Sequence, residues 1–190
     1  MFAGPRRGSA CGWAVSPWGQ VVEGIMSILE MVLPEKASNE FKGGRVPIIG
    51  FCLMLLPVTF RSLVHLFKGD SGVNSIATLH VFEGTPDPNA VIYMFSALGC
   101  LYQTVILLIY LIVLFRYRNL IPLMFVLMLV EIGFRIVVAT LHPLTEEFFV
   151  RTPPGKFTNL PFGLLSVVML FVTYRNLGRG KEVGREEARG

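Results

Sequence analysis

The stretch NLIPLMFVLMLVEIGFRIVVATLH, residues 119–142, is long and apolar enough to cross a bilayer as a helix. Glu131 and Arg135 near its middle are four residues apart, so their side chains lie on one helix face, with the acid in the favourable N-terminal position. Each charge alone costs about 2.5–3.5 kcal/mol at the bilayer centre, so this face must meet protein or water rather than lipid. We expect it to form the inner wall of a helical bundle. Its members are Met124, Met128, Glu131, Arg135, Ala139 and His142.

The composition of the whole chain agrees with a membrane protein. Of its 190 residues, 53% are hydrophobic and 16% are charged, whereas soluble domains carry about 25% charged residues. The net charge of +4 is not gathered into the basic, aromatic-rich patch that binds nucleic acid. The apolar runs are about twice as long as the ~10 residues of a membrane barrel strand. We expect an all-α integral membrane protein whose partner is the lipid bilayer and not nucleic acid.

Hydropathy predicts a four-span membrane domain over residues 46–177, followed by a charged tail over residues 178–190. The expected spans are residues 46–67, 91–115, 120–142 and 160–177. Between the first two spans, the segment DSGVNSIATLHVFE, residues 70–83, is expected to form a short amphipathic helix outside the membrane.

The first 45 residues form a separate N-terminal segment. Residues 1–15 lack the apolar run of about 7–15 residues that a signal peptide needs, so we expect no cleaved leader. Ser16 and Pro17 are typical of a helix start, and an amphipathic helix is expected over residues 17–33. Because its polar face is acidic, adhesion to anionic lipid is disfavoured and docking on a protein is the better interpretation.

Lysines and arginines in the short loops predict the orientation. Twelve of the 17 basic residues fall in the N-terminal segment, the turn at 116–119 and the tail, which share one side of a four-span bundle. The opposite side has Lys68, Arg151 and Lys156, and two arginines lie inside spans. Both termini are therefore expected to be cytoplasmic.

This topology gathers the unusual polar residues in the outer half of the bundle, namely Arg61, Tyr102, Gln103, Glu131 and Arg135. A buried ion pair that fixes helix register is one interpretation of the two charges in the third span. A ligand or ion site is the second interpretation. Two arginines against one acid would make a cationic pocket that favours an anionic headgroup, a carboxylate or a quinone-like carbonyl. Contact with a partner subunit is the third.

Histidines offer another candidate site, since His65 and His142 are expected near the outer interface and His80 in an outer loop. They are either interfacial side chains or ligands of a metal or haem. Neither HxxxH nor HExxH occurs, and Cys11, Cys52 and Cys100 are too isolated for a CxxC site.

Catalysis has little support in the sequence, because no GxSxG, HExxH or GK[ST] motif is present. We expect a non-catalytic accessory subunit that docks on a larger membrane complex or on copies of itself. Its bound cofactor would be a lipid, or a pigment or quinone-like molecule contributed by the complex. The alternative is a small binding or transport protein with an outward-facing cationic pocket, which predicts a connected cavity reaching Arg61, Glu131 and Arg135. Metal or haem binding through the outer-side histidines is a further alternative.

Overall fold

The computed structural model describes residues 17–153 and 155–187. The expectations for the first 15 residues, including Cys11, lie outside these described residues. Five α-helices follow one another in the described chain: α1 Pro17–Val32, α2 Arg45–Phe67, α3 Pro88–Arg116, α4 Ile121–Leu141 and α5 Gly155–Glu187. Single helical turns precede α4 at Arg118–Leu120 and follow it at Glu146–Phe148.

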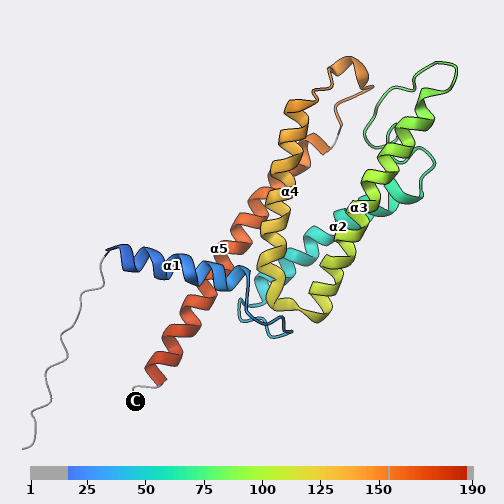
Figure 1. Cartoon of the computed structure of the whole chain (residues 1–190). Coiled ribbons are helices and arrows are strands. Elements are labelled where there is room, and N and C mark those ends of the chain that lie inside the picture. Colours follow the sequence, from blue (N-terminus) through green and yellow to red (C-terminus); the bar gives the residue numbers. More distant parts are fainter. Residues whose placement is uncertain (1–16, 154, 188–190) are drawn as a thin grey trace, which may run out of the picture.

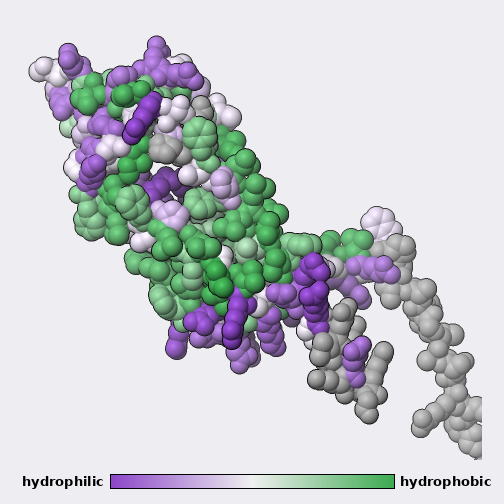
Figure 2. Space-filling view, turned by 180° about the vertical axis from the view of Figure 1, so that it is seen from behind, coloured by the Kyte–Doolittle hydropathy of each residue, from purple (hydrophilic) through white to green (hydrophobic). Residues whose placement is uncertain are grey.

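Four of these segments are long and apolar enough to cross a membrane, which confirms the predicted all-α four-span bundle. They are Arg45–Phe67, Pro88–Arg116, Arg118–Leu141 and Phe157–Gly180. The second span begins three residues before its predicted start because Asp87 caps α3. Its carboxylate accepts the Asn89 amide at 2.9 Å, and Pro88 occupies the first turn, where a missing amide costs nothing. Figure 2 shows hydrophobic residues around the middle of the molecule and hydrophilic residues at its two ends.

The spans are arranged as two helix pairs (Figure 1): α2 packs chiefly against α3, and α4 against α5. We call the end with the α1–α2 linker (33–44) and the tight turn 117–120 the turn end. The opposite end, with the long connections 68–87 and 142–154, is called the loop end. Both ends of the described chain lie towards the turn end (Figure 1).

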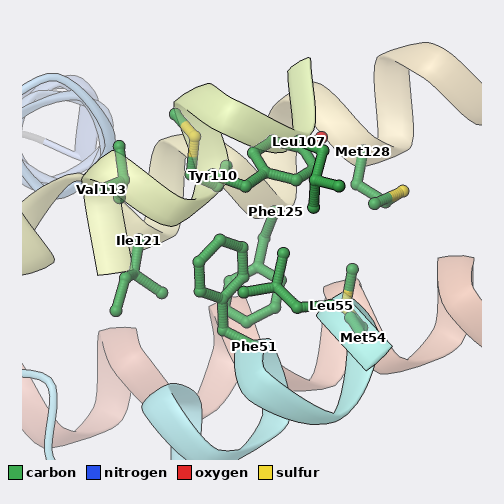
Figure 3. Close-up of a cluster of buried hydrophobic side chains, with 10 residues drawn as sticks. Phe51, Met54, Leu55, Leu107, Tyr110, Val113, Ile121, Phe125 and Met128 are labelled. Carbon is green, nitrogen blue, oxygen red and sulfur yellow. The ribbon is translucent and has the colours of Figure 1, made fainter. Parts of the chain in front are cut away.

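The hydrophobic core occupies the half of the bundle nearer the turn end. Phe51 of α2 makes edge-to-face contacts with Tyr110 of α3 and Phe125 of α4, with both ring centroids 5.7 Å away (Figure 3). Such edge-to-face pairs stabilise by about 0.5–1.5 kcal/mol beyond the area that they bury. Close packing holds these helices together, because lipid removes the hydrophobic drive for their association. Gly50 allows close packing of α2 on α5, since a Cβ there would lie 2.6 Å from the Met169 sulfur.

Asparagine side chains form hydrogen bonds that link separate segments at the turn end. Asn119, in the tight turn, accepts the Ser38 amide at 2.8 Å and donates to the Lys36 carbonyl at 2.7 Å. Asn176 of α5 donates to the Gly43 carbonyl at 2.7 Å. The α1–α2 linker is therefore bound to both helix pairs, which keeps them together at this end.

The amphipathic helix predicted over residues 70–83 is wrong, because residues 70–77 form turns and residues 78–83 are not helical. Ser71 and Gly72 adopt left-handed backbone angles, with φ of 46° and 71°, which end any helix continuing from α2. The Asp70 carboxylate accepts the amides of Gly72 at 3.1 Å and Ser75 at 2.8 Å, in place of helical carbonyls. The chain then pairs with the other long loop through a bridge between Leu79 and Phe149.

The outer two helices differ in length from expectation. Helix α1 confirms the predicted 17–33 helix within one residue, lies across the direction of the spans and contacts α4 (Figure 1). Helix α5 continues to Glu187 instead of ending at 177, so the first part of the predicted tail is helical. No proline interrupts residues 178–187, and their alternating acids and bases suit a helix surrounded by water.

Candidate functional site

Helices α2, α3 and α4 and the connection after α4 line a hollow of about 1170 Å³ in the half of the bundle nearer the loop end. All five residues of the predicted polar cluster line it: Arg61, Tyr102, Gln103, Glu131 and Arg135. A second hollow of about 410 Å³ shares four of them, all except the tyrosine. Figure 2 shows an opening in the hydrophobic surface with hydrophilic side chains inside it. The structure therefore brings together the residues that the topology predicted to converge.

Glu131 and Arg135 form the ion pair that their spacing in α4 predicts. The Arg135 Nε donates to Glu131 Oε1 at 3.1 Å, and its Nη2 donates to the same oxygen. The two side chains remain 27% and 31% exposed, because they face the hollow and are not sealed in the core. One carboxylate oxygen thus takes both donors, and the other oxygen forms no hydrogen bond within the described chain.

Arg61 of α2 lies beside this pair without sharing in it. No hydrogen bond or ion pair joins its guanidinium to another residue in the part of the chain that the structure describes. Arg61 and Arg135 against Glu131 give the cluster a formal charge of +1, and Glu146 and Arg151, which also line the hollow, cancel each other in this count. The hollow therefore contains one guanidinium that makes no hydrogen bond within the described residues, next to an acid that is already paired with Arg135.

Helix geometry places this charge within the membrane, on the side of the loop end. At about 1.5 Å per residue, Glu131 lies about 15 Å and Arg135 about 21 Å from the start of α4, at the turn end. The same rise puts Arg61 about 24 Å from the turn end of α2 and Gln103 about 20 Å from that of α3. In a hydrocarbon core of about 30 Å, these groups lie between the centre and the loop-end boundary. Charged side chains at such positions usually face the interior of the bundle or a water-filled cavity, which is where these side chains lie.

The predicted inner wall of α4 divides into two parts. Met124 and Met128 are buried in the core. Beyond the ion pair, Ala139 and His142 are exposed residues of the lining of the larger hollow. The first part of the stripe faces protein and the second faces the cavity, because α4 diverges from α2 and α3 towards the loop end (Figure 1).

The three histidines lie at different places in the loop-end half of the structure. His65 and His142 line the larger hollow, but His80 does not. His65 is buried and its Nδ1 donates to the Ser71 carbonyl at 2.6 Å, which fixes the ring against the first loop. Among the described residues, no three His, Cys, Asp or Glu side chains lie close enough together to hold a metal ion. The structure therefore does not bring His65, His80 and His142 together in one cluster.

The loop end forms a roof over part of the larger hollow. Residues 149–153 line it. The Thr78 hydroxyl donates to the Arg151 carbonyl at 2.5 Å, and the Val150 amide donates to the Thr78 carbonyl at 2.8 Å. These bonds hold the roof to the loop between α2 and α3, so both helix pairs help to position it.

Sequence reasoning missed the apolar rim of the larger hollow. Phe95 of α3 and Phe134 and Val138 of α4 line it while remaining 57–66% exposed, beside the predicted Tyr102. Hydropathy does not distinguish these residues from lipid-facing ones, since both kinds are apolar and lie outside the core. Only the arrangement of α3 and α4 in the fold shows that these residues border a cavity.

The fold defines an integral multi-pass membrane protein of the all-α class, with four spans around an intramembrane polar cluster. Comparison with protein families, with curated proteins and with solved structures finds no match to this chain.

Proposed function

We propose that the protein binds an anionic amphiphile in the larger hollow, with the negative group at Arg61 and the apolar part against the surrounding side chains. The observation that carries the proposal is the guanidinium of Arg61, which makes no hydrogen bond within the described residues and lines a mostly apolar cavity at membrane depth. A planar guanidinium binds a carboxylate through two parallel hydrogen bonds, which gives both affinity and orientation.

The neighbouring groups fit this role. The Arg135 guanidinium is already held by Glu131, so it shapes the pocket and adds positive potential without needing a second partner. Gln103 lines both hollows, and its amide can donate to a second oxygen of the ligand. These side chains can bind and orient an anionic group, which supports binding or transport as the proposed function.

Oleate and oleyl alcohol provide a direct test because they share a chain and differ in charge. In detergent, oleate at 100 times its Kd should stabilise the wild-type protein by about 2.7 kcal/mol, measured as a rise in Tm. Oleyl alcohol at the same concentration should have a much smaller effect. Equal effects of the two compounds would show that no anionic site is involved.

Arg61→Gln tests which residue carries the affinity. Hydrogen bonds to a charged group are worth about 1.5–3 kcal/mol, so this change should weaken oleate binding about 10- to 100-fold. Arg116→Gln is the matched control, because Arg116 is an exposed arginine near the turn end that lines neither hollow. A variant with Gln at position 61 that binds oleate like the wild type would overturn the proposal.

The accessory-subunit hypothesis is the second candidate, and α1 is the observation that favours it. Trp18, Ile25 and Leu29 on this helix are 80%, 59% and 52% exposed, although Met31 is buried. A partner covering this face should co-purify after gentle extraction and raise the native mass above that of one chain. Ile25→Glu should abolish that rise, and Gln20→Glu, at an exposed polar position of the same helix, should preserve it. A single-chain mass for the wild type would count against docking.

A further inference from the structure

The larger hollow reaches the side of the molecule between α3 and α4. Its lining includes exposed residues of both helices: Phe95, Gly99 and Tyr102 on α3, and Phe134 and Val138 on α4. Exposed residues that also line a cavity mark its rim. The hollow therefore has an opening between these two helices, which we call the α3–α4 opening and define by these five residues.

The α3–α4 opening lies at the depth of the lipid chains. Gly99 is about 17 Å from the loop-end start of α3 and about 26 Å from its other end, at about 1.5 Å per residue. The helix extends about 43 Å in total, well beyond a hydrocarbon core of about 30 Å. Gly99 consequently lies inside the core, and a molecule passing this opening comes from the acyl chains and not from water.

The separation of α3 and α4 follows from where their packing is concentrated. The buried core residues of α3 run from Leu107 to Val113, and those of α4 from Ile121 to Met128, all in the half nearer the turn end. Towards the loop end, the rim aromatics occupy the outer side of the gap. No hydrogen bond joins the side chains of α3 to those of α4 anywhere in the described chain.

Gly99 is the smallest residue at this opening. A Cβ built at Gly99 meets no heavy atom within 4 Å, so the position has open space in front of it. Gly133 on α4 has the same property, but it does not line either hollow. The two glycines therefore form a matched pair, one at the opening and one away from it.

We infer that the ligand is a long-chain monocarboxylate that enters sideways from the bilayer through the α3–α4 opening, carboxylate first, and leaves its chain in that opening. The formal charge of +1 on the cluster accepts one negative charge, and the apolar rim accepts a chain. Arg61 lies behind the rim, shared by both hollows, where an entering carboxylate meets it. This inference rests on the proposed anionic site and adds the ligand class and its route.

Photolabelling in phosphatidylcholine nanodiscs tests the route. The probe is stearic acid with a diazirine near the far end of its chain, added to the bilayer, and labelled peptides are identified by mass spectrometry. In the wild type, we expect labels on rim segments of α3 and α4, competed by oleate and reduced at least tenfold by Arg61→Gln. Gly99→Phe should reduce labelling at least fivefold, and Gly133→Phe should leave it unchanged.

The outcomes separate this inference from the proposed function. Labelling that does not depend on Arg61 would refute the anionic site itself. Labelling that depends on Arg61 but is equal in Gly99→Phe and Gly133→Phe would leave the site standing and refute the lateral route. Wild-type labels concentrated on α2 and α5 would refute it too, and this readout needs no variant. If Gly99→Phe does not fold, Gly99→Leu with the same control decides the point.

Discussion

Removing the carboxylate of Glu131 should destabilise the protein more than removing the guanidinium of Arg135. In Glu131→Gln, the cluster charge rises from +1 to +2, with Arg61 and Arg135 facing each other across one hollow. In Arg135→Gln, the charge falls to zero, and Arg61 is available to take over the freed carboxylate. The asymmetry depends on Arg61 being an uncommitted neighbour and would be absent if the ion pair were isolated.

The magnitude follows from the geometry. Glu131→Gln loses both charge-assisted hydrogen bonds, worth about 1.5–3 kcal/mol, and leaves a charge whose insertion costs about 2.5–3.5 kcal/mol at the bilayer centre. Glu131 and Arg135 are 27% and 31% exposed, and this partial exposure screens their charges. We therefore take about 2–3 kcal/mol as the net loss in the free energy of unfolding. At about 2–4 °C per kcal/mol for a chain of this size, Tm should fall by about 4–12 °C. Arg135→Gln should cost about 1 kcal/mol, because a new partner replaces the lost one.

Cysteine exposure gives a suitable assay. Cys100 is buried, so a maleimide dye that fluoresces on reaction with thiols reports unfolding in ligand-free detergent during a temperature ramp. Glu83→Gln is the control, since Glu83 is an exposed acid on the loop between α2 and α3. The reasoning is refuted if Arg135→Gln lowers Tm as much as Glu131→Gln, or if Glu131→Gln behaves like the control.

Three further predictions concern the ends of the bundle. Gly72→Ala should lower the free energy of unfolding by about 1–2 kcal/mol, because φ is 71° and a Cβ would lie 2.7 Å from the buried imidazole of His65. Gly69→Ala, with open space around the added Cβ, should leave thermal unfolding unchanged. Burial raises the pKa of the Asp70 carboxyl, but hydrogen bonds from the loop and a nearby lysine outweigh it and hold the pKa below its usual value. The ionised Asp70 carboxylate therefore stabilises the fold above its unfolded pKa of about 3.9, and this stabilisation is lost as pH falls through the lower folded pKa. The Tm difference between wild type and Asp70→Asn should accordingly shrink from pH 5 to pH 3. A Tm difference that stays constant over this range would refute the prediction. Asn119→Ala should lower stability by about 1–3 kcal/mol through two lost hydrogen bonds, while the exposed Asn39→Ala should have no effect in the same assay.

The sequence by itself determined the spans, because a segment in lipid must be apolar and must satisfy its own backbone. It also determined the Glu131–Arg135 pair, since a spacing of four residues fixes which helical side chains meet. The grouping of Arg61, Tyr102 and Gln103 around that pair followed from alternating span directions and regular helix rise, without any detail of packing.

Tertiary structure alone decided whether those polar groups would meet in a sealed core or around a hollow. The answer depends on the divergence of the two helix pairs, which arises from core packing at one end and long loops at the other. Residues 70–83 show a similar limit: their apolar spacing suits a helix, but the turn chemistry of Asp70, Ser71 and Gly72 and the bridge to Phe149 prevail. Hydropathy shows how strongly each residue favours lipid. It does not show which apolar helix faces pack against one another and which remain apart.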